Sequence, residues 1–367
     1  MRVLELCDYA AKYKGNVIES YEYLSRKCFG ADDLMVYAFP QRILPRRDLW
    51  YDDFSRESKT AVYSDGFIKK VLDIRRVVKK NRLDIVHTRF TDLKTDFAVN
   101  IACIGLGVKK IKHYCTSFGK WSGIKKIAAD LCYRKWSVIS ASDALSDEAF
   151  YNIDAQRKTV INNAVYFPRL DDYDVIKKTE IGFSENCVLY FMMGYDYTLK
   201  GIDLACEAVK NLREKFDACL AISVSSNVEK ITRQITEQLG GFPEWIKILP
   251  PRQDIATYYR LGDVYVQASR SEGFCNAVIE AAYCERCVVS SDCEGITCHA
   301  REKMDFFWFK NGDASDLARS LEEAAFNKDN KSILEKNKIS AIENYGVDAL
   351  AEKLYNEYSA VLQTAKQ

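Results

Sequence analysis

The chain has 367 residues and a mass of 42.0 kDa, and its 53 Lys and Arg against 52 Asp and Glu give a formal charge of +1. Hydrophobic residues make up 48% and charged residues 29%, an ordinary globular composition that excludes a disordered or fibrous chain. The charge near zero conceals a division, because residues 1–170 hold 30 basic and 20 acidic side chains whereas residues 171–367 hold 23 and 32. A basic half and an acidic half suggest different partners, one of them anionic; chance distribution of surface charge is the alternative.

The N-terminal segment does not indicate export or membrane insertion. Met1–Asp8 lacks the basic stretch and long apolar run of a secretory signal, and no window approaches the ~18 apolar residues of a membrane-spanning helix. The 13 cysteines are therefore expected to be reduced, buried thiols of a cytoplasmic protein. Cys284 and Cys287 have the C-x-x-C spacing of a zinc or redox site, but no second pair completes a tetrahedral site, so we predict no metal.

Short β-rich segments alternate with helical periodicity along the first half of the chain. Helices are expected at 17–27, 67–80 and 95–104. They lie between segments typical of strands, which are 2–6, 34–39, 83–88, 108–115, 137–141 and 159–162. This alternation is typical of a parallel sheet covered by helices on both faces.

A polar stretch with a proline, at 167–174, interrupts this pattern, and a second alternating series follows it. The clearest helix of this series is expected at 202–216, and its strands at 188–192, 218–224, 246–249, 264–267 and 287–290. The sequence thus predicts an α/β protein of two doubly wound, Rossmann-like domains, at 1–167 and 168–345. Residues 346–367 form a terminal helix that could pack back on the first domain.

The most informative segment runs from Ser269 to Ala282, after the expected strand at 264–267 and into a helix from about Asn276. A glycine turn at a helix N-terminus presents free backbone N–H groups and the positive end of the helix dipole, which suit a phosphate or diphosphate. Glu272 lies before this turn and Glu280 lies one turn inside the helix. We predict that Glu280 contacts hydroxyl groups of a ligand and that Glu272 lies nearer the reacting end of that ligand.

A second strand–glycine–helix turn runs from Gly194 to Gly201 and contains Lys200. Because the carboxyl ends of parallel strands meet at one edge of a sheet, Lys200 should lie near the first turn. One cation and two helix N-termini would then hold a diphosphate without a metal ion or other cofactor. Two ordinary β–α turns with solvated charged side chains are the alternative interpretation.

The segment Ser269–Asp292 resembles the E-x7-E signature of a large family of retaining glycosyltransferases with the GT-B fold, glycosyltransferase family 4. Gly194–Asp203 is similar to the glycine–lysine loop of this family, Val160–Val165 to the end of its first domain, and Asp84–His87 to a landmark within that domain. The resemblance spans most of the chain. It implies two Rossmann-like domains that face a cleft, and a nucleotide-diphospho-sugar donor with a bias to uridine.

The resemblance also implies roles for individual residues. Glu272 would contact the donor sugar, Lys200 would neutralise the departing phosphate, and Glu280 would bind the ribose hydroxyls. His113 would approach the sugar from the first domain, with a structural histidine at a strand end as the alternative. The remaining donor-site residues that the resemblance implies are Gly273, Phe274, Cys275, Asn276, Gly194, Tyr195, Arg252, Gln253, Gly15 and Asn16.

Several positions depart from the family pattern. Tyr195 stands where the family has an arginine, and Ala164 stands where it has a glycine after Asn163. The first glycine pair of the family is reduced to Gly15-Asn16. These departures keep a second hypothesis open, namely a non-catalytic partner subunit that retains the fold but not the turnover.

The basic half contains a cationic segment with its own apolar stripe, since residues 109–136 hold eight basic side chains and one acidic one. The stripe consists of Ile124, Ile127, Ala128 and Leu131, and the aromatic residues beside it are Trp121, Tyr133 and Trp136. This pattern is typical of a helix that binds an anionic membrane surface. A helix whose apolar face is ordinary core is the alternative, and no nucleic-acid partner is expected.

The motifs, the charge division and the resemblance lead to one functional prediction. We expect a metal-independent, retaining hexosyltransferase in the cytoplasm, peripheral on the inner face of the plasma membrane. The acidic domain would bind a nucleotide-diphospho-sugar. The basic domain would bind a glycan or lipid-linked glycan acceptor that is extended for a bacterial surface polysaccharide.

Overall fold

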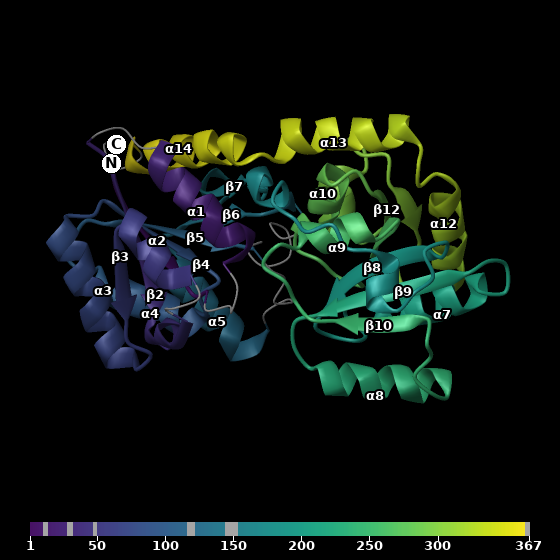
Figure 1. Cartoon of the computed structure of the whole chain (residues 1–367). Helices are drawn as coiled ribbons and strands as arrows, with labels where there is room; N and C mark the ends of the chain where they lie inside the picture. The colour runs from purple at the N-terminus through teal and green to yellow at the C-terminus, as the bar shows by residue number, and fades with distance from the viewer. Residues whose placement is uncertain (10–13, 28–31, 47–49, 116–121, 144–152, 364–367) are drawn as a thin grey trace. The chain divides into compact units, whose positions relative to one another are not determined.

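The structure is a computed structural model, and it describes residues 1–9, 14–27, 32–46, 50–115, 122–143 and 153–363. The chain divides into two compact units (Figure 1). Unit 1 comprises Met1–Ala164 together with Val347–Gln367, and unit 2 comprises Val165–Gly346. The boundary that the sequence suggests after residue 167 therefore falls after Ala164.

Unit 1 is built on a seven-stranded sheet with the order β3-β2-β1-β4-β5-β6-β7, in which every pairing is parallel. Its strands are β1 (Arg2–Cys7), β2 (Leu34–Pro40), β3 (Thr60–Tyr63), β4 (Ile85–Arg89), β5 (Lys109–Tyr114), β6 (Ser137–Ser140) and β7 (Lys158–Val160). The central strands read as nearly continuous buried runs because helices cover both faces of the sheet.

The helices of unit 1 form two layers. From β1 the chain steps outward to β2 and β3, and from β4 it steps the other way, so right-handed connections place the two sets of helices on opposite faces. On one face α3 (Phe67–Asn81) packs on α4 (Leu93–Ala102), and α4 packs on α5 (Gly123–Tyr133) (Figure 1). The other set contains α1 (Gly15–Lys27) and α2 (Asp52–Glu57).

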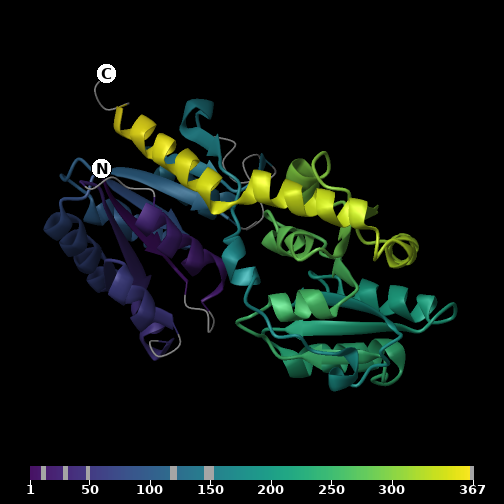
Figure 2. The ribbon, with the colours of Figure 1, turned by 45° about the horizontal axis from the view of Figure 1, so that its top comes forward.

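The C-terminal helix α14 (Val347–Gln363) belongs to unit 1 and packs beside α1 (Figure 2). Its Tyr358 hydroxyl lies 2.7 Å from Nδ1 of His87 on β4, and both groups are buried. Thr159 on β7 donates a hydrogen bond of 2.8 Å to Glu357. These contacts return the end of the chain to the first unit.

Unit 2 has a six-stranded parallel sheet with the order β10-β9-β8-β11-β12-β13. Its strands are β8 (Val188–Gly194), β9 (Ala218–Val224), β10 (Ile246–Leu249), β11 (Val264–Gln267), β12 (Cys287–Ser291) and β13 (Phe307–Phe309). Its α-helices are α7 (Ile202–Leu212), α8 (Val228–Leu239), α9 (Ala256–Leu261), α10 (Asn276–Tyr283), α11 (Glu294–Ala300), α12 (Ala314–Phe326) and α13 (Lys331–Tyr345). The core lies between the sheet and the apolar faces of α7 and α12.

The strand order of unit 2 reverses between β8 and β11. The chain runs outward from β8 to β9 and β10, and then outward from β11 to β12 and β13 on the other side. At such a switch point the loops after the two adjacent strands diverge and leave a crevice, which is where open α/β sheets bind ligands. The fold therefore points to the β8–α7 and β11–α10 loops.

The sequence expectations were incomplete at the edges of both sheets. The short edge strands β3 and β13 and the helix α2 were not predicted, and the helix expected at 202–216 ends at Leu212. Tyr133 and Trp136, expected to flank an exposed stripe, are buried instead, because the Tyr133 hydroxyl bonds Asp96 and the Trp136 ring nitrogen bonds Asn100. Trp121 and Lys120 lie outside the described residues.

Candidate functional site

Lys200 and Glu272 meet at the switch point of unit 2. Lys200 ends the loop that follows β8, and Glu272 lies in the loop that follows β11. The Lys200 ammonium lies 2.5 Å from Oε1 of Glu272, and the two side chains are 15% and 12% exposed. The sequence expectation that these two turns lie together therefore holds for this pair.

Two glycines hold the β8–α7 loop in place. Gly201 has a φ of +65°, and a Cβ there would lie 2.0 Å from the carbonyl oxygen of Ala268 in the neighbouring loop. A Cβ on Gly194 would lie 2.9 Å from the side chain of Ile202. Asp196 closes the turn by accepting hydrogen bonds from the backbone N–H groups of Thr198 and Leu199. The close approach of the two loops is what aims Lys200 at Glu272.

The electrostatics of the pair favour the charged form of the lysine. Burial alone would lower the pKa of Lys200, but the adjoining Glu272 carboxylate offsets this effect and the pKa lies above its usual value. The ammonium also lies 5.2 Å from the centroid of the Tyr195 ring. Tyr195 thus contacts the lysine at the position where the resemblance leads one to expect an arginine.

Hydrogen-bonded polar side chains at the end of β11 hold Glu272 in place. Gln267, the last residue of β11, donates hydrogen bonds from Nε2 to Glu272 at 2.9 Å and to Ser269 at 2.6 Å. The buried Tyr265 hydroxyl donates to Oε1 of Gln267 at 2.8 Å and thereby fixes the orientation of the amide. Sequence reasoning missed Gln267 and Tyr265. Their spacing of two on one strand, which places both on the same face, was the available signal.

The start of α10 departs from ordinary backbone geometry. Cys275 precedes the helix with a φ of +67°, a left-handed conformation that favours glycine. Burial, reinforced by the Glu272 charge, holds the pKa of its thiol well above the usual range. The next residue, Asn276, has a buried Oδ1 without a hydrogen-bond partner among the described residues. Gly273 lies close to Gly295 of α11, because a Cβ on Gly295 would come 3.3 Å from the carbonyl carbon of Gly273.

Phe274 is a core residue rather than a ligand-facing one. Its ring is buried and stacks on His299 of α11 with centroids 4.0 Å apart. Nε2 of His299 lies 2.7 Å from the Phe274 carbonyl oxygen. Only the backbone of Phe274 therefore remains available for the role that the resemblance implies.

Glu280 is already engaged by protein groups. One carboxylate oxygen accepts from Arg169 at 3.1 Å and the other accepts from the buried Tyr259 hydroxyl at 2.9 Å. Arg169 belongs to the 3-10 helix η4 (Phe167–Leu170), in the stretch that the sequence suggests is a linker. Each carboxylate oxygen can accept a further hydrogen bond, so these contacts orient Glu280 without saturating it.

Arg252 and Gln253 follow β10, the edge strand, which β9 separates from β8. The Arg252 guanidinium bonds Asp254 at 2.8 and 2.6 Å and Asp174 at 2.5 Å. These hydrogen bonds, with Asp254 first, raise its pKa despite burial. Gln253 is exposed. Arg252 is thus already engaged by two acidic side chains, and a role of Arg252 and Gln253 beside a nucleotide base stays a prediction.

The unit 1 candidates lie in two places. Gly15 begins α1 with a φ of +58°, and Asn16 donates a hydrogen bond of 2.6 Å to the Ala164 carbonyl; residues 10–13 of the same loop lie outside the described residues. His113, on β5, is 1% exposed and stacks on His87 with centroids 5.3 Å apart. Burial, reinforced by the charge of Arg89, lowers the pKa of His113 well below its usual value.

His113 borders a buried cluster that sequence reasoning missed. Glu5 on β1 accepts from Arg89 at 3.1 Å and from Tyr21 at 2.9 Å, and lies 2.8 Å from His87. Burial would raise the pKa of Glu5, but the charges of His87 and Arg89 outweigh it and the pKa is lowered. Both nitrogens of His113 lack a hydrogen-bond partner among the described residues. The buried ring of His113 therefore lacks the hydrogen bonds expected of a structural histidine.

The cysteine and acidic side chains of the described ranges form no cluster of three or more that could hold a metal ion. Cys284 and Cys287 are buried, and burial raises the pKa of their thiols to about 12 and about 11. No helix in the part of the chain that the structure describes is long and apolar enough to span a bilayer.

Comparison with known proteins finds a family model that matches the region of the site. Residues 186–327 match the profile of the family described as "Glycosyl transferases group 1". This range includes Lys200, Glu272 and Glu280.

Two relatives share part of the sequence. The chain is 22% identical over 272 residues, 69% of each chain, to the Escherichia coli UDP-Gal:alpha-D-GlcNAc-diphosphoundecaprenol alpha-1,3-galactosyltransferase. It is 28% identical over 118 residues, 32% of this chain and 31% of the relative, to the Campylobacter jejuni N,N'-diacetylbacillosaminyl-diphospho-undecaprenol alpha-1,3-N-acetylgalactosaminyltransferase.

Solved structures share the fold along the whole chain. A glycosyltransferase from Rickettsia africae superposes with a TM-score of 0.80 at 17% identity, covering 98% of both chains. Anabaena HepE in complex with UDP and glucose gives a TM-score of 0.77 at 14% identity, covering 98% of this chain and 100% of HepE. Residues 186–327 are therefore similar to a glycosyl transferases group 1 domain, and the chain has the GT-B fold, as the E-x7-E segment indicates.

Proposed function

We propose that this protein is a retaining, metal-independent glycosyltransferase that moves a sugar from a UDP-sugar to a lipid-linked glycan. The observation that carries the proposal is the Lys200–Glu272 pair at the β8/β11 switch point, inside the group 1 domain. The printed names of the two relatives support transfer to a diphosphoundecaprenol-linked sugar, and one of them names UDP-Gal as donor. Both relatives are transferases, which favours the catalytic hypothesis over a non-catalytic subunit.

The main catalytic task is to stabilise the departing diphosphate. The bond between C1 of the sugar and the β-phosphate oxygen breaks with its electron pair on that oxygen. The acceptor hydroxyl oxygen bonds C1 on the same face, and its proton passes to the departing phosphate. Lys200 and the N-termini of α7 and α10 supply the positive charge at this end of the sheet, so the reaction needs no metal ion. Glu272 orients the sugar.

The acidic surroundings bear on how the diphosphate is held. Residues 171–367 carry 23 basic and 32 acidic side chains, so long-range attraction does not favour an anion there. Binding must depend on local donors, and the ion pair with Glu272 keeps Lys200 charged and positioned before the donor arrives. With a lipid-linked acceptor, we further propose that the reaction takes place at the cytoplasmic surface of a membrane.

The test is a transfer assay with the purified full chain. An undecaprenyl-diphospho-N-acetylglucosamine acceptor is offered with UDP-galactose, UDP-N-acetylgalactosamine, UDP-glucose or GDP-mannose, with and without EDTA. We expect transfer from a UDP-sugar that EDTA does not abolish, with an α-configured product by NMR. A β-configured product would overturn the retaining mechanism, and loss of activity in EDTA would overturn metal independence. If the protein neither transfers nor hydrolyses any UDP-sugar, the proposed donor class is wrong.

A further inference from the structure

Helix α5 of unit 1 is apolar on two sides. Its packed side consists of Ala129, Cys132 and Tyr133. Helical spacing places Ile124, Ile127 and Leu131 on the opposite side, where they are 86%, 61% and 64% exposed. The exposure excludes the interpretation that this stripe is ordinary core. A helix that already has a packed side gains nothing for folding from three aliphatic residues on the other.

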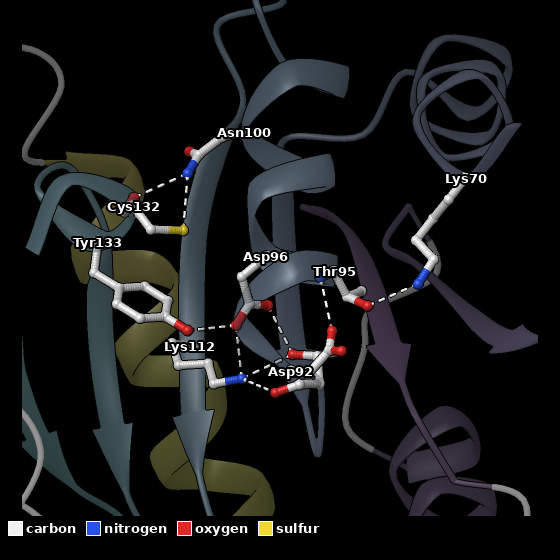
Figure 3. A network of polar contacts seen from close by, with 9 residues as sticks. Lys70, Asp92, Thr95, Asp96, Asn100, Lys112, Cys132 and Tyr133 are labelled. Carbon is white, nitrogen blue, oxygen red and sulfur yellow. Dashed lines mark hydrogen bonds and ion pairs between the residues drawn. The ribbon is translucent and has the colours of Figure 1, made fainter. Parts of the chain in front are cut away.

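A buried polar network fixes which side of α5 faces the sheet (Figure 3). The Tyr133 hydroxyl donates to Asp96 of α4 at 2.5 Å, and the ammonium of Lys112 on β5 lies 2.8 Å from the same carboxylate. Asn100 of α4 donates to the Cys132 carbonyl at 2.9 Å. Asp96 is buried, so rotation of α5 would remove the Tyr133 hydroxyl from this carboxylate and the Cys132 carbonyl from Asn100. The outward direction of the stripe is therefore set by the fold.

The neighbouring helices extend the same surface. On α3 the outward residues Ile68 and Leu72 are exposed, opposite the buried face that contains Ile74 and Val78. Ile101 and Ile104, at the end of α4, are exposed as well, and Arg75 of α3 ties that end to α3 by donating to the Ile104 carbonyl at 2.9 Å. Leu44 and Tyr355 are the only other large hydrophobic residues exposed in the described part of unit 1. Exposed aliphatic residues thus gather on one face.

Basic residues surround this aliphatic surface. Residues 67–82 contain seven Lys and Arg and one acid, Asp73, which Arg76 and Ser64 already bond. Residues 123–136 contain four Lys and Arg and one acid, Asp130, which pairs with Lys126 at 2.8 Å. Cations beside an exposed aliphatic surface match the anionic headgroups and acyl chains of a bilayer. A second copy of the same face would be repelled by its like charge.

We propose that the exposed face of α3, α4 and α5, hereafter the α3–α5 face, binds the surface of an anionic lipid bilayer. Ile124, Ile127 and Leu131 enter the boundary between headgroups and acyl chains, and the flanking Lys and Arg contact lipid phosphates. This proposal rests on the proposed function only in that a lipid-linked acceptor would bring the protein to a membrane. Binding to the bilayer itself needs neither donor nor acceptor.

The experiment is co-sedimentation of the full chain with vesicles of phosphatidylcholine alone or with about 30 mol% phosphatidylglycerol, free of undecaprenyl lipids. We expect binding to the anionic vesicles only, weakening with salt. The double variant I124E/I127E should lose at least about tenfold in partition coefficient. The variant I339E/I342E provides a matched control, because Ile339 and Ile342 are an exposed pair with the same spacing on α13 of unit 2. It should bind as the wild type does.

A second variant separates charge from apolar insertion. K79Q/K80Q/K125Q removes three exposed cations and should weaken binding to anionic vesicles by roughly 100-fold while leaving the melting temperature unchanged. Equal binding of wild type and I124E/I127E would overturn the proposal. So would a wild-type dimer that I124E/I127E converts to a monomer without any vesicle binding, since the α3–α5 face would then join two copies. Vesicle binding by a protein that transfers no sugar would refute the proposed function alone.

Discussion

The Lys200 ammonium and the Glu272 carboxylate form an ion pair of 2.5 Å although 72 residues separate them in the sequence. Each comes from the loop after one of the two strands that flank the switch point, so the pair exists only because β8 and β11 are neighbours. Under the proposed function, an incoming diphosphate would compete with Glu272 for the same ammonium. Replacing one anionic partner by another avoids exposing an unpaired buried cation at any stage.

Lys200→Ala should therefore reduce sugar transfer by about 10²–10³-fold, the magnitude usual for loss of one group that stabilises developing charge. The matched control is Lys210→Ala, an exposed lysine on the same helix–loop segment, which should leave transfer unchanged. Initial rates with the same donor and acceptor give the comparison. Transfer by Lys200→Ala within about twofold of the wild type would show that Lys200 does not serve the leaving group.

Gly295 of α11 limits where the Glu272 loop can lie. A Cβ on Gly295 would come 1.9 Å from the Glu272 carbonyl oxygen, so Gly295→Ala must push this loop or the helix away. We expect a loss of about 1–3 kcal/mol in the free energy of unfolding and weaker binding of the UDP-sugar. Gly66→Ala, where a Cβ meets nothing within 4 Å, is the control: it should leave UDP-sugar binding unchanged and cost less than about 1 kcal/mol of stability, since Gly66 is only the N-cap of α3. Urea unfolding and calorimetric titration measure both; wild-type values for Gly295→Ala would contradict the crowding argument.

Much of the fold could be predicted because it is encoded locally. The expected bounds of β9, β10 and β11 agree with the structure, since each is a short run of apolar residues between turn signals. The placement of Lys200 near Glu272 was also predictable, because loops at the carboxyl ends of parallel strands converge. The three-residue edge strand β13 was missed because so short a run carries little periodicity.

The partners of Glu280 could not be predicted from the sequence. Arg169 lies 111 residues away in a polar stretch with a proline, which has the composition of a linker. The structure packs this stretch on unit 2, where the Phe167 ring stacks on Tyr283 at 4.5 Å and Tyr283 donates to Asp171. The composition of a segment can indicate that it forms no regular helix or strand. It cannot indicate whether tertiary contacts hold that segment in place.

Cys275 offers a test of local strain at the candidate site. Its φ of +67° is costly for any residue with a Cβ, by about 1 kcal/mol or slightly more. Both substitutions remove the thiol, so their comparison reports on the backbone alone. We expect Cys275→Gly to be more stable than Cys275→Ala by about 1 kcal/mol in urea unfolding. At Ala277, inside α10, the same Ala-to-Gly change should instead destabilise the protein by about 1 kcal/mol. Equal stability of the two Cys275 variants would indicate that the backbone relaxes to a negative φ.

His299 should make the stability of the protein depend on pH. Burial lowers the pKa of this imidazole to about 4, although its hydrogen bond to the Phe274 carbonyl acts in the opposite direction. The unfolded chain takes up a proton near pH 6.5, whereas the folded chain does so only near pH 4. Between these values the unfolded state binds more protons, so stability falls as the pH falls, by about 3 kcal/mol across the whole window.

His299→Phe removes the titrating group but keeps an aromatic ring to stack on Phe274. This variant should be less stable than the wild type at neutral pH, because the Phe274 carbonyl loses its donor. Its free energy of unfolding should nevertheless decline less steeply on acidification. Part of the slope should remain, since burial also holds the pKa of His113 well below its usual value. Parallel curves of unfolding free energy against pH for wild type and His299→Phe would show that the imidazole is not held neutral in the folded protein.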